Sequence, residues 1–221
     1  MATIAELLRA QAQKAQSNSA RERVVIVGKT HMGGGVCVGG MVERTGLPVR
    51  ILPVGGFCHP PETGFEVGEV WEMFLRQRTG LTPPHSEDHD EWGANRAAKI
   101  GDLRNWILGK RKPVIGGPEA LFGGRMKFTS AGKGFLRPDP PVPNWSTDFW
   151  ELPFALMHYK QDQTDRYRSE SGPTFDVKYV GHQSPAAKLP RGLLVRISLT
   201  RWFTIAPERG EECWLQLSGW F

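Results

Sequence analysis

The first candidate for nucleotide chemistry is Gly28-Lys29-Thr30, which follows a run of β-branched residues. A lysine and a hydroxyl after a buried strand are what a phosphate-binding loop uses. Such a loop also needs a glycine five residues earlier and a helix directly after it. This chain instead has Arg23 and then Gly33-Gly34-Gly35, and a dinucleotide-binding fingerprint would need a glycine at Val38. We therefore exclude both motifs, and the loop 28–35 is either a plain hairpin loop or an anion site built from backbone amides.

Two pairs of residues carry side chains that ligate metals. His85 and His89 share the spacing of the histidines in HExxH zinc proteins, but nearby prolines and polar residues favour a loop. Cys58 and His59 lie in a proline-stiffened corner, and their spacing to other ligands matches no zinc pattern. We predict a polar loop and ordinary packing, respectively, and neither a bound metal nor a cofactor.

The loop-rich stretch 113–143 mixes basic and aromatic side chains. Cations that track phosphates and rings that stack on bases are typical of sites for single-stranded nucleic acid. An amphipathic strand with a solvated face has the same composition, so both interpretations stay open. The residues concerned are Arg125, Lys127, Lys133, Arg137, Phe122, Phe128 and Phe135.

The elements that must position these side chains are mostly short strands between glycine-rich corners. We predict strands at residues 24–27, 36–42, 49–54, 68–76, 152–159, 174–180, 193–203 and 213–221. The last strand is strongly apolar, so we expect it to be paired within a sheet. Residues 1–20 are predicted to form a short helix.

Residues 91–108 form the strongest helical pattern, with Asp90 as the N-cap and Gly109 as the stop. Apolar residues recur at helical spacing, and the opposite face and the helix exit are basic. These basic residues either complement the helix dipole or contact nucleic acid.

Composition indicates a globular protein with many corners. The chain has 221 residues, 39% of them hydrophobic, with 26 Gly, 17 Pro and a net charge of +5. That charge is compatible with a polyanionic partner without requiring one. Three widely spaced cysteines argue against a disulfide framework, and no apolar run is long enough for a membrane span. We predict a cytoplasmic protein with no membrane association.

Together these patterns predict a mainly β protein made of two small OB-like antiparallel barrels, with one amphipathic helix between them and a short N-terminal helix. The predicted organisation is an N-terminal helical extension at 1–20, a first barrel plus helix at 21–112 and a second barrel at 113–221. A short echo between residues 48–52 and 194–199 hints at two similar barrels.

Two separated parts of the chain carry a family resemblance. They are residues 29–40 with 59–61 and 65–68, and residues 198–202 with 216–220. In these stretches the chain resembles the dual OB-containing domain family of prokaryotes, over residues 24–221. The resemblance implies two OB-like barrels and membership of a prokaryotic conflict or antiviral defence system, and it carries over no catalytic residue.

The favoured functional prediction is a non-enzymatic module that binds nucleic acid, with a preference for single strands. DNA, RNA and a nucleotide remain open as the ligand. Cationic residues would contact phosphates, and Phe128 and Trp202 would stack on bases. The predicted cations are Lys29, His31, Arg50, Arg125, Lys127, Lys133, Arg196 and Arg201.

Two alternatives come from other functional classes. The first is an adaptor whose barrels and N-terminal helix dock on a larger nuclease or ATPase encoded nearby. The second is an enzyme or ligand sensor that uses the glycine loop with His31 and Cys37, or the pair His85 and His89. No nucleophile, base and orienting acid form a set, so this alternative ranks last.

Overall fold

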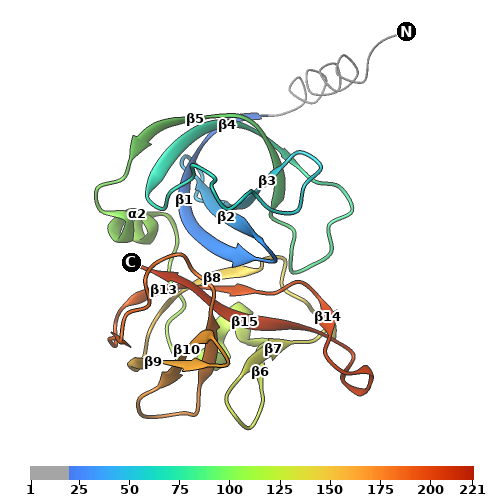
Figure 1. Cartoon of the computed structure of the whole chain (residues 1–221), viewed down its shortest axis with the longest axis vertical. Coiled ribbons are helices and arrows are strands. Elements are labelled where there is room, and N and C mark those ends of the chain that lie inside the picture. The colour runs from blue at the N-terminus through green and yellow to red at the C-terminus, as the bar shows by residue number, and fades with distance from the viewer. Residues whose placement is uncertain (1–19) are drawn as a thin grey trace. The chain divides into compact units, whose positions relative to one another are not determined.

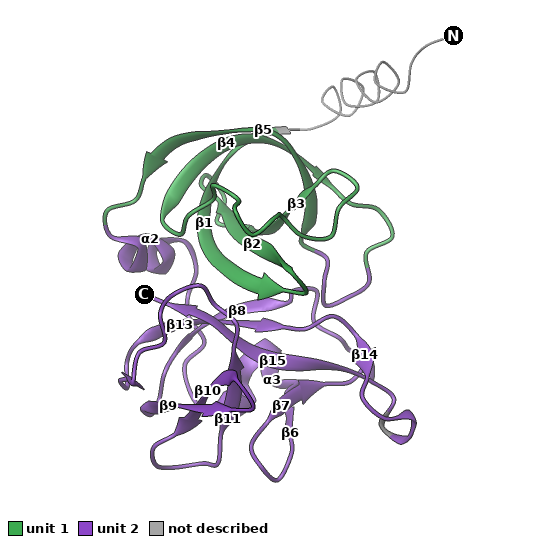
Figure 2. Ribbon diagram, in the orientation of Figure 1, with its two compact units in different colours: residues 1–81, 87–101 green, residues 82–86, 102–221 purple. Residues whose placement is uncertain are grey.

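The computed structural model describes residues 20–221, which form two compact units (Figures 1 and 2). Unit 1 comprises the described residues up to Leu81 together with Glu87–Gly101, and unit 2 comprises Thr82–Ser86 and Asp102–Phe221. Both units are built mainly from β-strands, as the sequence predicts. The predicted N-terminal helix lies outside the described residues, except for Ala20, which begins the first strand.

Unit 1 is a closed five-stranded barrel with the strand order β1-β2-β3-β5-β4. β3 and β5 are parallel, and the other pairs, including β1 with β4 across the closure, are antiparallel. The strands are β1 (Ala20–Met32), β2 (Gly35–Val42), β3 (Pro48–Pro53), β4 (Glu69–Gln77) and β5 (Asp88–Lys99).

The connection between β1 and β2 is much shorter than the predicted loop 28–35. β1 continues through Lys29 to Met32, which pairs with Gly35, so only Gly33 and Gly34 form the turn. Their φ angles of 49° and 93° suit the tight turn of a two-residue hairpin and favour glycine. The glycines therefore have a geometric role in this turn.

Alternating side chains from the strands fill the barrel of unit 1. Val24 and Ile26 of β1 pack with Val38 of β2 and Ile51 of β3, and all four are buried. A Cβ atom at Gly40 would lie 2.4 Å from Cγ1 of Val24, so a larger residue does not fit there. Val25 and Val27, which point to the opposite face, are buried as well, so the run 24–27 is covered on both faces.

The predicted helix at residues 91–108 is wrong for most of its length. Asp88–Lys99 is the long strand β5, which pairs with both β3 and β4, and Trp92 is one of its buried residues. The helix α2 spans only Leu103–Lys110 and is capped by Asp102, whose carboxylate accepts a hydrogen bond from Asn105 N–H. Barrel closure needs the backbone groups of β5, and this requirement overrides the helical spacing.

Unit 2 contains a sheet of ten strands. Seven of them follow the order β12-β9-β10-β11-β15-β13-β8, and the other three, β6, β7 and β14, pair outside this path. Among the described residues no pairing joins β12 to β8, so this strand order is open. The predicted strand 152–159 begins later than expected, because residues 152–155 connect β8 to β9, which starts at Leu156. The elements after α2 are η1 (Pro118–Ala120), α3 (Leu121–Gly124), β6 (Lys127–Phe128), β7 (Gly134–Leu136), β8 (Thr147–Glu151), β9 (Leu156–Gln161), β10 (Thr164–Ser169), β11 (Asp176–Tyr179), β12 (Lys188–Leu189), β13 (Leu194–Leu199), β14 (Phe203–Thr204), η2 (Pro207–Arg209) and β15 (Glu211–Trp220).

β15 is paired within the sheet of unit 2, as its apolar sequence predicts, and it has more partner strands than a single neighbour on each side. It pairs with β13, β7 and β14 in antiparallel fashion and with β11 in parallel. Its Cys213, Leu215 and Leu217 are buried in a core that also holds Trp150 and Tyr167.

No helix of the described chain has the length and apolar character needed to cross a bilayer.

The buried thiol of Cys213 makes the stability of unit 2 sensitive to alkaline pH. Burial, and to a lesser extent Glu211, raises its pKa from 9.0 to about 12. Between these values the folded state binds more protons than the unfolded state, so the free energy of unfolding falls as pH rises. We expect Cys213→Ala to flatten this fall by up to about 1.4 kcal/mol per pH unit, measured by urea unfolding between pH 9 and 11. If the variant shows the same dependence of the unfolding free energy on pH as the wild type, the prediction is contradicted. Any dependence that remains in the variant is expected from Tyr167, because burial also raises its pKa to about 12.

Candidate functional site

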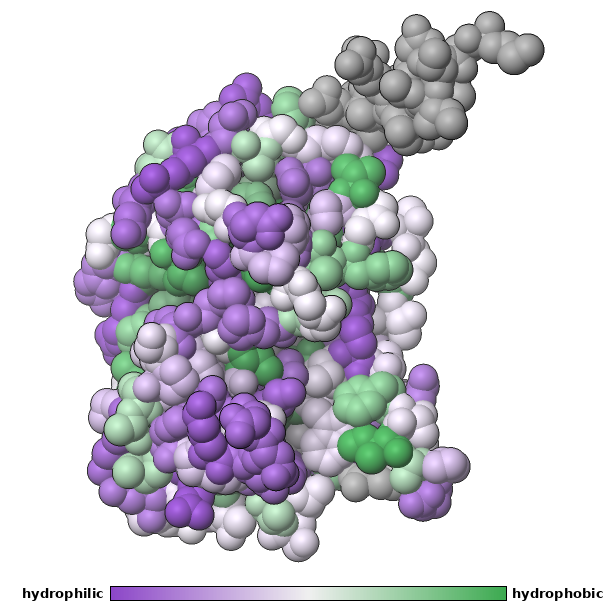
Figure 3. All heavy atoms as spheres, viewed as in Figure 1, coloured by the Kyte–Doolittle hydropathy of each residue, from purple (hydrophilic) through white to green (hydrophobic). Residues whose placement is uncertain are grey.

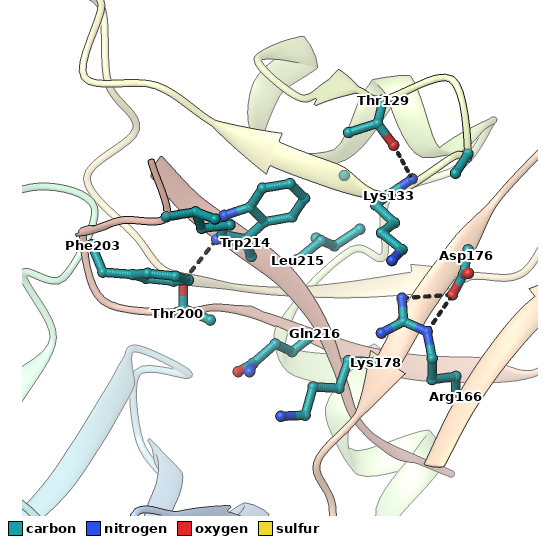
Figure 4. A pocket seen from close by; sticks show the side chains of 13 residues that line it. Thr129, Lys133, Arg166, Asp176, Lys178, Thr200, Phe203, Trp214, Leu215 and Gln216 are labelled. Atoms are coloured by element: carbon teal, nitrogen blue, oxygen red, sulfur yellow. Dashed lines mark hydrogen bonds and ion pairs between the residues drawn. The ribbon is translucent and has the colours of Figure 1, made fainter. Parts of the chain in front are cut away.

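Unit 2 contains a pocket of about 520 Å³, lined by residues from β10, β11, β14, β15 and the turn before β7 (Figure 4). Three cationic side chains and one carboxylate line it, together with two aromatic rings. In Figure 4, Phe203 and Trp214 lie at one side, and Lys133, Arg166 and Asp176 lie at the other. The pocket therefore has an aromatic side and a charged side.

Strand register places the polar wall of the pocket. Arg166 of β10 lies opposite Lys178 of β11, and Lys178 lies opposite Gln216 of β15. Directly opposite residues point to the same face of a sheet, so these three side chains form a row. The intervening Tyr167 and Val177 point to the other face, into the core.

The aromatic side is held by the backbone of β15. Trp214 N–H donates to Thr200 Oγ1 at 2.7 Å, and Thr200 N–H donates to the Trp214 carbonyl at 2.9 Å. The Trp214 ring packs on Phe135 with centroids 5.3 Å apart. Phe203 on β14 leaves 43% of its surface exposed, next to the still more exposed Ile205. Figure 3 shows this hydrophobic patch at the surface over β14.

Arg166 is held within a network at the charged side. Its guanidinium lies 2.7 Å from Asp176 Oδ1, and Tyr159 donates its hydroxyl proton to Asp176 Oδ2 at 2.6 Å. Burial and the hydrogen bond to Asp176 raise the pKa of Tyr159. Burial alone would lower the pKa of Arg166, but its bonds to Asp176 and Tyr159 outweigh this and raise it. Arg166 therefore stays charged, and its guanidinium is paired with the Asp176 carboxylate.

Lys133 and Lys178 supply the net positive charge of the pocket. Lys133 ends a turn in which its N–H donates to Thr129 Oγ1 at 3.1 Å, and it bridges to Asp176 on β11 through the backbone. In the part of the chain that the structure describes, neither lysine ammonium makes an ion pair within 4.0 Å. Both charges are available to an anionic ligand.

Of the ten predicted site residues, only Lys133 lines this pocket. Arg125 is exposed, and Lys127 is exposed but lies 3.0 Å from Asp139. Phe128 packs against the core of unit 2. Arg196 is buried, and its guanidinium donates to Ser218 Oγ at 2.9 Å.

The two remaining predicted site residues of unit 2, Arg201 and Trp202, come directly after Thr200 in the chain. Arg201 is exposed. Trp202 packs against the core and donates its indole N–H to the Pro83 carbonyl at 2.8 Å. A ring anchored in this way has less surface left for stacking than Phe203 has.

Two of the three predicted cations of unit 1 form ion pairs with acidic residues of the same unit. Lys29 is buried, with its ammonium 2.7 Å from Glu66 Oε1. Arg50 and Asp88 form an ion pair at 2.6 Å, and both side chains are largely buried. His31 is exposed near the end of β1. Lys29 and Arg50 are therefore paired with acids inside unit 1, whereas His31 is at its surface.

The candidate metal ligands are held by backbone carbonyls. Nε2 of His59 lies 3.1 Å from the Ile51 carbonyl, and burial lowers the His59 pKa. His85 contacts the Thr200 carbonyl in unit 2, and His89 contacts the Glu87 carbonyl in unit 1. Within residues 20–221 no group of three or more His, Cys, Asp or Glu side chains could hold a metal ion.

Four residues that line the pocket were not among the predicted site residues: Arg166, Lys178, Phe203 and Trp214. A signal for the first two exists, because β10 and β11 alternate polar residues with the buried Tyr167, Val177 and Tyr179. That alternation assigns Arg166 and Lys178 to one sheet face. No sequence signal predicts that β14 and β15 add aromatic rings to the same pocket.

No protein-family model, no curated protein and no solved structure matches this chain.

Proposed function

We propose that this protein binds single-stranded nucleic acid without catalysing a reaction, as a component of a prokaryotic antiviral defence system. The observation that carries the binding proposal is the pocket of unit 2, which Lys133 and Lys178 line together with the partly exposed ring of Phe203. Cations for phosphates and rings for bases are the two parts that single-strand sites combine. The role in defence follows from the family resemblance.

The barrel of unit 1 supports membership of the dual OB-containing domain family. An OB fold is a five-stranded Greek-key barrel that binds oligonucleotides on its second and third strands and adjoining loops. Unit 1 has five strands in the order β1-β2-β3-β5-β4, with closure through β1 and β4. We propose that unit 1 is an OB barrel and that unit 2, with its open strand order, is a divergent second one.

The pocket is tested by a paired substitution. We expect Lys133→Ala combined with Lys178→Ala to weaken binding of a fluorescent ten-nucleotide single strand by about tenfold at low salt. The plot of log affinity against log salt concentration becomes shallower by about 1.4, because each lost phosphate contact on a single strand removes about 0.7. Fluorescence anisotropy at several salt concentrations measures both quantities.

The matched control is Lys160→Ala, which removes an exposed lysine of β9 whose ammonium lies 4.0 Å from Asp165. This residue does not line the pocket, so we expect unchanged affinity and an unchanged salt slope. Equal losses in the control and the double variant would contradict a specific role for the pocket. A wild-type protein that binds no single strand would overturn the proposal as a whole.

An adaptor function is the second candidate, and a loop of unit 1 favours it. Phe57 is 77% exposed and Val54 53% exposed in the connection between β3 and β4. Arg78 holds this connection by donating to the carbonyls of Pro53 and Gly56. Ordered, exposed apolar side chains are typical of protein contact surfaces. If single strands do not bind, docking on a larger nuclease or ATPase becomes the favoured function.

A further inference from the structure

We infer that the pocket of unit 2 is a site for one nucleotide, with the base against Phe203 and Trp214 and the phosphate at Lys133 and Lys178. The inference rests on the proposed function and narrows it to a ligand class, a nucleoside monophosphate unit. That unit is either a free nucleotide or one residue of a strand.

The size of the pocket limits the ligand. Sites for small molecules typically measure about 300–1,000 Å³, and this pocket measures about 520 Å³. It lies within one unit, between strands whose register fixes its walls. A longer strand would place one nucleotide in the pocket and the others outside it.

The aromatic side has the shape that a base requires. Trp214 is immobilised by its backbone bonds to Thr200 and by the ring of Phe135, so its position exists before a ligand binds. Phe203 stays partly exposed on a two-residue strand that pairs only through Phe203 and Thr204 to β15. A base that stacks there covers apolar surface that water otherwise contacts, which favours binding.

The charged side has the electrostatics that a phosphate requires. Asp176 is the only carboxylate among the lining residues, and its oxygens already accept hydrogen bonds from Arg166 and Tyr159. Its repulsion of an anion is therefore largely offset, and Lys133 and Lys178 dominate the field. A terminal phosphate carries a charge of about −1.5 to −2, so it gains more from two lysines than a phosphodiester does.

The row of Arg166, Lys178 and Gln216 runs from the charged side of the pocket toward its aromatic side. Gln216 lies next to Lys178 across β11 and β15, and its amide offers both donors and an acceptor. In Figure 4 the Gln216 side chain lies between Lys178 and the aromatic side. This position lets Gln216 contact the sugar or the base edge of a nucleotide whose phosphate is at Lys178.

The test uses the full chain and three small probes, adenosine 5′-monophosphate, adenosine and inorganic phosphate. Each competes with a labelled ten-nucleotide strand and is also titrated alone by calorimetry. We expect the monophosphate to bind at least tenfold more tightly than adenosine or phosphate, because only it engages both sides of the pocket. Phe203→Ala should weaken its binding about tenfold, and Lys133→Ala with Lys178→Ala by a similar factor.

Phe57→Ala is the control for loss of an exposed phenylalanine, since it lies in unit 1, and it should leave monophosphate binding unchanged. Suppose that binding of the ten-nucleotide strand depends on Lys133 and Lys178, but millimolar monophosphate does not displace this strand. That result overturns the one-nucleotide site and leaves the proposed function standing. Inorganic phosphate that competes as well as the monophosphate also overturns it, because the base then contributes nothing. Absence of both strand and monophosphate binding overturns the proposed function itself.

Discussion

Replacing Asp88 with alanine is expected to destabilise unit 1 by about 3–5 kcal/mol. The Asp88 carboxylate lies 2.6 Å from Arg50 Nη2, and the two side chains are only 3% and 13% exposed. Burial raises the pKa of Asp88, and the charge of Arg50 counteracts that shift. Removing the carboxylate leaves a guanidinium in the barrel wall without its counter-ion. Hydrogen exchange of the amides of β3 and β5 in increasing urea measures the loss for unit 1 alone.

The control is the double replacement Arg50→Met with Asp88→Leu, which removes both charges. Exchanging a buried ion pair for apolar side chains is often neutral or stabilising, so this variant should stay close to the wild type. It also tests the predicted phosphate contact at Arg50. Unchanged strand binding in the folded double variant assigns Arg50 to the barrel, and a loss of binding returns it to the site. A fully stable Asp88→Ala variant would refute the structural role of the pair.

Replacing Trp150 with alanine is the second change with a large expected effect, about 3–5 kcal/mol of destabilisation in unit 2. Trp150 on β8 is fully buried, and its ring packs edge-on against Phe154 and Phe175. Its indole N–H donates to the Gly116 carbonyl at 3.0 Å. The variant loses apolar contacts, leaves a cavity and removes the hydrogen bond to the Gly116 carbonyl. Urea unfolding with hydrogen exchange read in β13 and β15 measures the effect.

Two variants bracket this result. Trp150→Phe keeps a ring in the core but not the hydrogen bond, so we expect a smaller loss of about 1–3 kcal/mol. Ile115→Ala changes a side chain that is 67% exposed, and its effect should stay within about 0.5 kcal/mol. A Trp150→Ala variant no less stable than Ile115→Ala would contradict the assignment of Trp150 to the core.

The strands of unit 1 were the most predictable part of the fold. The runs around Val38 and Ile51 are β-branched and apolar, and each became a barrel strand close to its expected bounds. The run around Val24 also became a strand, but β1 extends from Ala20 to Met32, well beyond the expected residues 24–27. Glycines at positions 33 and 34 correctly indicated a tight corner. These signals are local, because strand propensity and turn conformation depend on neighbouring residues.

The helix prediction at residues 91–108 failed because the competing force is not local. Trp92 and the apolar residues after it have helical spacing, but β5 closes the barrel between β3 and β4. A strand that completes two ladders satisfies more backbone groups than an isolated helix of the same sequence. Within the predicted range, only the residues that belong to α2 (Leu103–Lys110) have the helical conformation.

The sequence by itself determined that this protein is mainly β, where most of its strands lie and which loop chemistries are excluded. The tertiary structure alone decided which charges remain available: Arg50 and Lys29 are paired with acids, whereas Lys133 meets Lys178, Phe203 and Trp214 at a pocket. The physical reason is that strand patterns act over a few residues, whereas ion pairs and pockets join residues that are distant in the chain. Residue type shows that a lysine is charged, and only its neighbours in space show what that charge can bind.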